Sequence, residues 1–521
     1  MIAEPLMSRR HVGYSAVRSH RRKAEPMPTR GRTPRLRRWR SIAGVAAVAS
    51  VGSAFLVPAA AGAEESDGVP GAGPCASDVS NEVGSIIPEE LDIPIPYPAI
   101  TTVPYPAPEP PQERYDPGPL PPDPCTDPCP DLTDDDQRPS NLSSEIGIPR
   151  LGLDFNPFYF GIPVPGPEQE LPPPPPEADP PVEAAPRAPA PSRPVVGDVT
   201  RVSKVTGEGS ISRTHKRYQV YGTDLGIMWE TQPGQVAVAF GDTVGKGFHP
   251  PGGQGGDWRS NVLGFSTDRN LANGMTLDSM VQDSRCHAAE LLSSRKLDNV
   301  EITTIPTSGF AVGDRQYMSY MSIRTWNSIP ATWWTNHGGI AYSDDGGSTW
   351  TKDPYAKWEN IFGVTKFQVQ AMVPHEGYVY MFGTPNTRLG SVGLARVPED
   401  QVLNKSAYQY WQNDVWTPVA DYTEASTIVS APVAELSVRF DEASGKWQMS
   451  YLDTSKAAIS LRESDTPQGA WTDSVPMVSA LEYPELYGGF IHPWSTGRDL
   501  YFTMSTWSDY NVFLMRADVT R

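Results

Sequence analysis

Short apolar runs recur in pairs through residues 200–521, and this repetition restricts the fold more than any other feature. The pairs begin at VAVAFGDT (236–243), QYMSYMSIRTW (316–326), GYVYMFGTPN (377–386), KWQMSYLDT (446–454) and DLYFTMSTW (499–507). A further apolar segment precedes each pair, which makes five copies of a three-strand unit. Such repetition indicates a radial arrangement, in which each small sheet buries both faces against its neighbours. The pattern predicts an all-β, five-bladed β-propeller. A sixth blade would require a unit hidden in ITTIPTSG or QYWQNDVWTPVADYT.

One turn supports this prediction. SDDGGSTW (343–350) fits S-x-D-x-G-x-T-W, the Asp-box of many glycosidase propellers, and SDTPQGAW (464–471) is a degenerate copy. The Asp-Gly turn closes a hairpin and the Trp packs between blades, so we expect Asp345 to be structural rather than catalytic. CHAAELLSS (286–294) is the one stretch that favours a helical turn, and we expect HKRYQVYG (215–222) to close the ring.

The N-terminal region has the layout of a secretory signal. Residues 1–40 contain twelve Lys and Arg against two Glu, and residues 41–63 are uncharged and end in Ala-Gly-Ala. We predict a signal peptide over 1–63 and a location outside the cell or in the cell envelope; a retained membrane anchor is the alternative. Without this segment 31 basic and 59 acidic side chains remain, a net charge of −28. Such a chain repels nucleic acid and anionic lipid, whereas a neutral polysaccharide suits it.

Residues 64–196 hold 35 of the 55 prolines. Proline removes backbone donors, so we expect no sheet or helix here but a largely disordered, semi-rigid spacer, through which the protein associates peripherally with the envelope. The folded domain is predicted over 197–521. The spacer contains Cys75, Cys125 and Cys129, for which disulfides of undetermined pairing are favoured over zinc. Cys286 is expected to be a buried small apolar residue.

The stretch GTDLGIMWETQPGQVAVAFGDT (222–243) has an aspartate at each end of a predicted hairpin. Antiparallel pairing brings the start of one strand beside the end of the next, so Asp224 and Asp242 are expected at the same edge of blade one. Two neighbouring carboxylates are what glycoside hydrolysis requires, one as proton donor and one to activate water or attack directly. The alternative is that both are ordinary turn residues capping strands.

We call this reasoning the edge rule: the start of one strand and the end of the next lie at the same edge of a sheet. Applied to the other predicted strands, it proposes further residues of the pocket. The candidates for binding substrate are Asp257, Trp258, His287, Trp326, Asn386, Arg388, Glu435, Asp453, Tyr487 and His492. Each of them alone has a packing or turn role as its alternative. TWWTNH (332–337) contains two adjacent tryptophans, one of which should face outward on a strand. That residue is either a platform for a sugar ring or a side chain that packs between blades. No tight spacing of His and Asp indicates a metal site and no cofactor is required, although a channel ion stays open.

Residues 215–521 resemble a bacterial family of endo-D-arabinanases that was first grouped as a domain of unknown function. GTDLGIMW, FGDT, DWRSNVLGFSTD, GGIAYSDDGGSTW, YLDT and YGGFIHP carry the resemblance. It implies a five-bladed propeller that cleaves within the D-arabinan of arabinogalactan and lipoarabinomannan in mycolic-acid bacteria. It also implies that Asp224 and Asp242 form an inverting acid–base pair, and which of them is the acid stays open.

Two other functions remain as alternatives. A non-catalytic carbohydrate-binding or envelope-scaffold propeller would tolerate Asn at positions 224 and 242. A sialidase-type exoglycosidase would require an arginine cluster and a Tyr/Glu nucleophile pair, and no such arrangement is legible in the sequence. We expect the protein to act as a monomer.

Overall fold

The structure is a computed structural model that describes residues 90–105, 150–166, 173–175, 189–253, 255–327, 332–418 and 422–521. The predicted signal peptide and Cys75, Cys125 and Cys129 lie outside the described residues. Within the described ranges the chain is almost wholly β-structure, and α2 (Thr214–Tyr218) is the one α-helix. None of the helices described there has the length and apolar character needed to cross a membrane. The predicted all-β class is confirmed.

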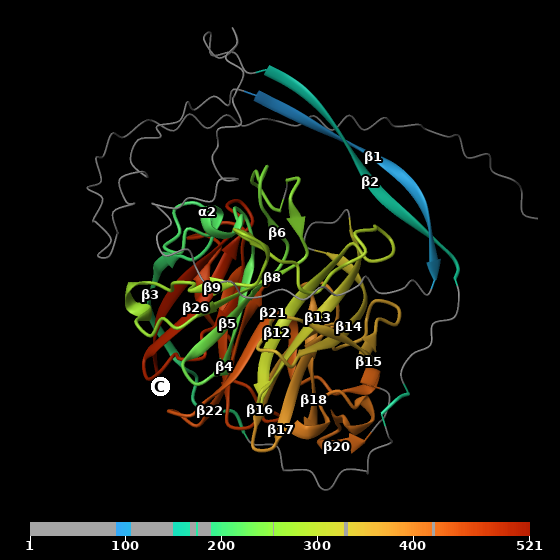
Figure 1. Ribbon diagram of the computed structural model, residues 1–521. Helices are drawn as coiled ribbons and strands as arrows, with labels where there is room; N and C mark the ends of the chain where they lie inside the picture. The colour runs from blue at the N-terminus through green and yellow to red at the C-terminus, as the bar shows by residue number, and fades with distance from the viewer. Residues whose placement is uncertain are drawn as a thin grey trace, which may run out of the picture. The chain divides into compact units, whose positions relative to one another are not determined.

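The strands of residues 189–521 form antiparallel groups that follow one another along the chain (Figure 1). The first contains β4 (Leu225–Gln232), β5 (Gln235–Phe240), β8 (Val262–Ser266) and β9 (Ser279–Met280). The second contains β12 (Thr303–Val312), β13 (Arg315–Trp326), β14 (Trp333–Ser343) and β15 (Thr351–Glu359). Short pairs of strands, β6 (Thr243–Val244) with β7 (Trp258–Arg259) and β10 (Gln282–Ser284) with β11 (His287–Ala288), lie in the connections.

The third and fourth groups share one nine-stranded sheet, joined by a short pairing of β18 with β21. The third has β16 (Val369–His375), β17 (Tyr378–Thr384) and β18 (Gly390–Pro398), extended by β19 (Gln409–Gln412) and β20 (Val415–Pro418). The fourth has β21 (Val429–Asp441), β22 (Lys446–Asp453), β23 (Ala458–Ser464) and β24 (Val475–Ser479). The fifth group has β25 (Leu486–Ile491), β26 (Asp499–Thr506) and β27 (Asn511–Thr520).

The groups are connected through their first strands. β4 contacts β12, β12 contacts β16, β16 contacts β21, β21 contacts β25, and β25 contacts β4, which completes a cycle. The fifth sheet is completed by β3 (Val195–Lys204), which pairs with β27. The prediction that residues 215–222 supply the closing strand is wrong. Most of α2 lies in that stretch. Arg213 before the helix and Gln219 after it both have a left-handed φ of 51°, which sets its two ends.

Part of the proline-rich region forms strands, contrary to the expectation that no sheet propagates there. β1 (Glu90–Tyr105) and β2 (Arg150–Pro165) pair in parallel along their whole length. The prolines of β1 stand at positions 94, 96, 98 and 104, and those of β2 at 157, 163 and 165. Backbone N–H groups of residues i and i+2 point to the same edge of a strand, so the missing donors of each strand face one side and leave the other side able to pair.

Aromatic side chains fill the spaces between neighbouring groups. Trp350 is 1% exposed and meets Trp229 of β4 edge to face at 6.3 Å. The turn before Trp350 is held by Asp345, which accepts hydrogen bonds from the Thr349 amide (2.9 Å) and hydroxyl (2.6 Å). These contacts agree with the expected structural role of Asp345.

Of two smaller predictions about residues 286–294, the helical turn is wrong and the character of Cys286 is confirmed in part. The segment contains β11 and no helix, because Cys286 adopts a left-handed φ of 64° that starts a strand pairing rather than a helical turn. Cys286 is buried as expected but is disulfide-bonded, so it is a covalent cross-link rather than only a small apolar side chain.

Candidate active site

The β4–β5 hairpin places Asp224 and Asp242 at the same edge, as predicted. Leu225 is paired with Phe240, and the Gly241 amide donates to the Asp224 carbonyl at 3.2 Å. Asp242 is therefore one residue beyond the partner of Asp224. A side chain at position 241 would displace Asp224, because a Cβ there would lie 2.3 Å from Asp224 Oδ1.

A β-bulge recurs in the strands at this edge and redirects their side chains. Leu225 has a φ of 72°, and the register of β4 shifts between Leu225 and Ile227. Glu435, with a φ of 51°, marks a similar shift in β21, and Gly488 and Gly489 mark one in β25. β-bulges redirect side chains, and non-glycine residues with positive φ concentrate at functional sites. Three of the five first strands therefore carry a bulge beside a candidate residue.

Asp242 accepts two hydrogen bonds that partly offset the cost of burying its charge. Thr303, the first residue of β12, donates from its hydroxyl to Asp242 Oδ1 at 2.6 Å, and the Trp258 indole donates to the same oxygen at 3.1 Å. Lys296 lies over the Trp258 ring, 4.0 Å from its centroid. Burial raises the pKa of Asp242 to about 6, and the bond from Thr303, the charge of Lys296 and the bond from Trp258 limit the rise.

Asp224 is in a less polar environment. Its Oδ2 accepts from the Tyr487 hydroxyl at 3.0 Å, while its buried Oδ1 has no hydrogen-bond partner. Burial and the neighbouring charge of Asp242 raise the pKa of Asp224 to about 8. Tyr510 is close to both carboxylates, and burial together with their charges raises its pKa well above the usual range.

An ion pair supports the Asp224 side of the site. Arg388 donates to Glu435 through Nε at 2.9 Å and also through Nη2, and the Gly488 amide donates to the other Glu435 oxygen at 2.8 Å. The Arg388 guanidinium lies 5.1 Å from the centre of the Tyr487 ring. Arg388, Glu435 and Tyr487 are thus brought together with Asp224, as the edge rule predicts.

Asp257 and His287 form a separate charged cluster beside Trp258. His287 contacts Asp283 at 2.7 Å and Asp257 at 3.2 Å, and these two bonds raise its pKa to about 9. Burial opposes ionisation of Asp257, but the bond from His287 and the charge of Arg259 outweigh it, so the pKa of Asp257 is lowered. Asp257 is therefore an ion-pair partner of His287 and Arg259.

The remaining predicted residues have diverse positions. Trp326 is 45% exposed at the end of β13, and Asn386 is buried, with its amide donating to the Trp333 carbonyl at 2.8 Å. Asp453 ends β22 but accepts from Ser474 at 3.0 Å in a hollow that Lys456 also lines.

The structure does not bring His492 to the site. β25 begins beside Asp224 with Leu486 and Tyr487 and ends at Ile491, so His492 lies at the other end of that strand. It is fully buried there, and its Nδ1 accepts from the Trp494 amide at 3.2 Å.

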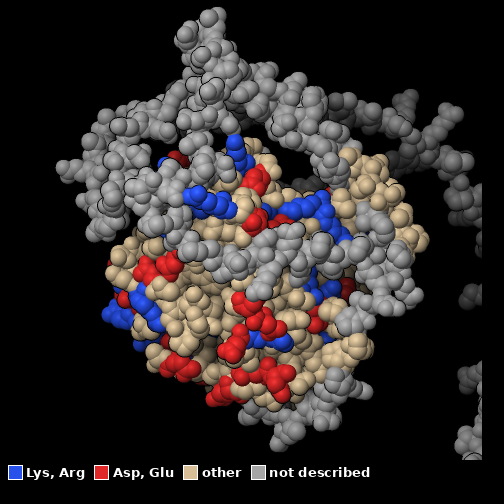
Figure 2. Space-filling view, viewed as in Figure 1, with Lys and Arg blue, Asp and Glu red and all other residues tan. Residues whose placement is uncertain are grey.

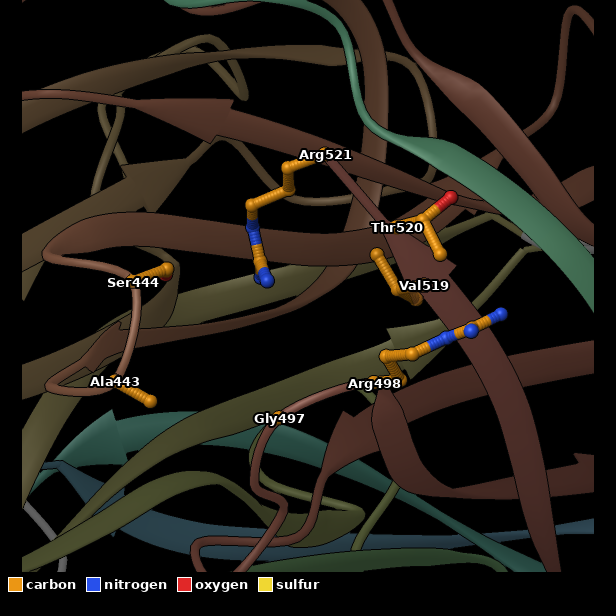
Figure 3. Close-up of a pocket in the computed structure, with 7 residues that line it drawn as sticks. All are labelled: Ala443, Ser444, Gly497, Arg498, Val519, Thr520 and Arg521. Carbon is orange, nitrogen blue, oxygen red and sulfur yellow. The ribbon is translucent and has the colours of Figure 1, made fainter.

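A second hollow lies far from the carboxylates in the fold, at the end of β21 opposite Glu435. It lies between the turns at Ala443–Ser444 and Gly497–Arg498 and the C-terminal end of β27 (Figure 3). Arg521 lines it and pairs with buried Glu463 at 2.8 Å. No carboxylate lines this hollow, so it offers no acid–base pair. Basic and acidic side chains are interspersed on the molecular face of Figure 2.

Sequence reasoning missed Thr303, Tyr510, Lys296 and Glu290. Thr303 begins a first strand, so the edge rule would have found it. Lys296 donates to Glu290 Oε2 and to the Trp258 carbonyl (3.0 Å) from an irregular connection that no pattern indicates. Among the residues that the structure describes, no group of three or more His, Cys, Asp or Glu side chains is arranged to hold a metal ion.

Two fungal proteins are similar to the chain in sequence. Notoamide biosynthesis cluster protein J of Aspergillus sp. (strain MF297-2) is 31% identical over 332 residues, which cover 58% of this chain and 83% of that protein. Protein J' of Aspergillus versicolor is 31% identical over 328 residues, with 58% and 84% covered.

Similar solved structures match only weakly. A putative hydrolase from Bacteroides ovatus has a TM-score of 0.39 and 13% identity over 58% of this chain and 87% of that one. An exo-beta-1,3-galactanase from Phanerochaete chrysosporium has a TM-score of 0.38 and 10% identity, with 62% and 64% covered. Scores this low carry no weight for function.

The family model described as "Domain of unknown function (DUF4185)" matches residues 209–516, more than half of the chain, and the protein therefore belongs to that family.

Proposed function

We propose that the protein is a glycoside hydrolase in which Asp224 is the general acid and Asp242 the general base. One observation carries the proposal: two carboxylates share one strand edge in environments that separate their pKa values, about 8 for Asp224 and about 6 for Asp242. At neutral pH Asp224 then holds a proton and Asp242 is ionised. Paired carboxylates with separated pKa values are the usual basis of acid–base assignments in glycosidases.

Asp224 donates its proton to the glycosidic oxygen, so that the bond from the anomeric carbon to that oxygen breaks and the leaving sugar departs as an alcohol. The neutral acid is expected to carry its proton on Oδ1, because Oδ2 already accepts from the Tyr487 hydroxyl. The buried position keeps the acid neutral until substrate arrives.

Asp242 takes a proton from a water molecule, whose oxygen attacks the anomeric carbon from the opposite face and inverts its configuration. The Thr303 and Trp258 donors both bind Oδ1, which leaves Oδ2 for the water. An inverting site needs about 6.5–9.5 Å between its carboxyl groups. Directly opposite and diagonal neighbours on one face of paired strands have Cβ atoms about 5–8 Å apart, a range that overlaps this requirement.

We further propose D-arabinan as the polymer and internal linkages as the point of cleavage, on the strength of the sequence resemblance. The cycle of contacts among β4, β12, β16, β21 and β25 supports five blades around a central axis. The same proposal includes export of the protein, directed by residues 1–63, and its action at the cell envelope.

The test is incubation of the full chain with purified arabinogalactan, followed by chromatography of the released oligosaccharides. We expect wild type to release internal fragments and the Asp224→Asn and Asp242→Asn variants to lose about 100- to 10,000-fold in rate, the range of a general acid–base contribution. Asp257→Asn is the matched control, since Asp257 is paired with His287 and Arg259. Undiminished release by both variants would overturn the assignment, and binding without release by wild type would favour a carbohydrate-binding module.

Two further measurements address the mechanism. The profile of kcat/KM against pH should be bell-shaped, with limbs near 6 and 8. Proton NMR of the first product formed should show the inverted anomer, and a retained anomer would exclude Asp242 as a base acting on water.

A further inference from the structure

We propose that Trp326 is a distal sugar-binding platform, which holds the polymer at a distance from the bond that is cleaved. The proposal rests on the proposed function, because the ligand is another part of the same neutral polysaccharide. Trp326 ends β13 and is 45% exposed, so its indole is accessible to a ligand.

The exposed indole has a rigid support. Trp326 is paired directly with Trp333 at the start of β14, and the two rings meet edge to face at 6.0 Å. Trp333 is 4% exposed, and its carbonyl accepts from the buried Asn386 amide at 2.8 Å. A side chain held in this way loses little conformational entropy when a ligand stacks on it.

A largely buried row of side-chain contacts connects this platform with the candidate acid. The Arg388 guanidinium lies 5.9 Å from the centre of the Trp333 ring and 5.1 Å from that of Tyr487. Tyr487 in turn donates to Asp224. The row thus connects Trp326 with the position of bond cleavage through contacts between adjacent groups.

The chemistry of the exposed Trp326 platform and its support suits a neutral polyol. The charge of Arg388 is already paired with Glu435, so the row presents no unpaired charge to a ligand. Flat aromatic faces next to fixed polar groups bind the C–H face of a sugar ring, while its hydroxyls remain solvated or hydrogen-bonded. Trp333 and Tyr487 are only 4% and 3% exposed, so they support the row and do not themselves contact the ligand. A polymer that contacts Trp326 at one end and Asp224 at the other would pass over them, which favours long substrates and cleavage within the chain.

The test compares Trp326→Ala with wild type on purified D-arabinan polymer and on a D-arabinan tetrasaccharide. We expect the loss of kcat/KM on polymer to exceed the loss on tetrasaccharide by about tenfold, and Trp326→Phe to recover most of it. Trp334→Ala is the matched control: Trp334 is the next aromatic residue, 37% exposed, and faces the other side of the hairpin against Gly363. Equal losses on the two substrates, or equal effects of the Trp326 and Trp334 substitutions, would overturn the platform.

Binding of the protein to the polymer, measured separately from cleavage, distinguishes an error in the proposed platform from an error in the proposed hydrolase activity. In gels containing arabinogalactan, we expect polymer to retard wild type and Trp334→Ala but not Trp326→Ala. This result would support the platform even if wild type released no oligosaccharide, which would overturn only the hydrolase. Wild type that polymer does not retard would overturn the platform. Far-UV circular dichroism and thermal midpoints of all variants exclude misfolding as the cause.

Discussion

Replacing Thr303 by Val tests the assignment of Asp242 as the base. The Thr303 hydroxyl is buried and lies 2.6 Å from Asp242 Oδ1. Val has nearly the same shape, so the substitution removes one hydrogen bond to the ionised carboxylate and leaves the second, from Trp258, in place. Losing a donor to the charged form raises the pKa of Asp242.

The size of the shift follows from the energy of that bond. A hydrogen bond to a charged group contributes about 1.5–3 kcal/mol, and one pKa unit corresponds to about 1.4 kcal/mol. The pKa of Asp242 should therefore rise from about 6 to roughly 7–8. At pH 6 the ionised fraction of Asp242 falls from about one half to between about a tenth and a hundredth, so kcat/KM should fall about 5- to 50-fold.

The assay is the full profile of kcat/KM against pH on arabinan. The acidic limb should move to higher pH in Thr303→Val, and the loss should shrink towards pH 8. Thr303→Ser keeps a hydroxyl and should keep the wild-type limb. Thr304→Val removes a hydroxyl from the next buried residue and controls for packing. An acidic limb that stays in place in Thr303→Val, or moves equally in Thr304→Val, would refute Asp242 as the base.

Three further outcomes are expected. Gly241→Ala should lower kcat/KM at least about 100-fold with little change in thermal midpoint, because its Cβ would lie 2.3 Å from Asp224 Oδ1 and displace the acid; activity within tenfold of wild type would contradict this. Burial raises the folded-state pKa of Asp224 from 3.8 to about 8, so stability is lost as pH rises through that window, and Asp224→Asn should gain thermal midpoint over wild type in calorimetry, more at pH 8 than at pH 5. Asp345→Ala loses the bonds from Thr349 and Ser343 and should lower the free energy of unfolding by about 2–3 kcal/mol in denaturant titrations while kcat/KM is retained.

The part of the site that follows from local pairing was predictable from the sequence. Asp224 and Asp242 are connected by one hairpin, and antiparallel geometry fixes their common edge whatever the rest of the fold does. Tyr487 and Glu435 follow from the same rule applied to other first strands. The rule failed for His492 because it depends on which end of a strand a residue occupies. β25 is only six residues long, and His492 follows the end opposite Tyr487.

Features that depend on distant or irregular segments were not predictable. Lys296 reaches Trp258 from a connection without periodicity. The disulfide of Cys286 joins residues whose pairing no spacing reveals. β3 was hidden because its alternating VVGDVTRVSK pattern directly follows a proline-rich stretch, which masks a strand boundary.

The pairing of β3 with β27 has a consequence for how the molecule forms. Val195–Lys204 and Asn511–Thr520 belong to one sheet, although nearly the whole domain lies between them in the sequence. Contacts over such separations form late and slowly, since the intervening chain must first be brought into order. The earliest strand of the domain therefore has no partner until the last one is available. A chain shortened at either end would leave an unpaired sheet edge, the kind of surface on which chains associate with one another.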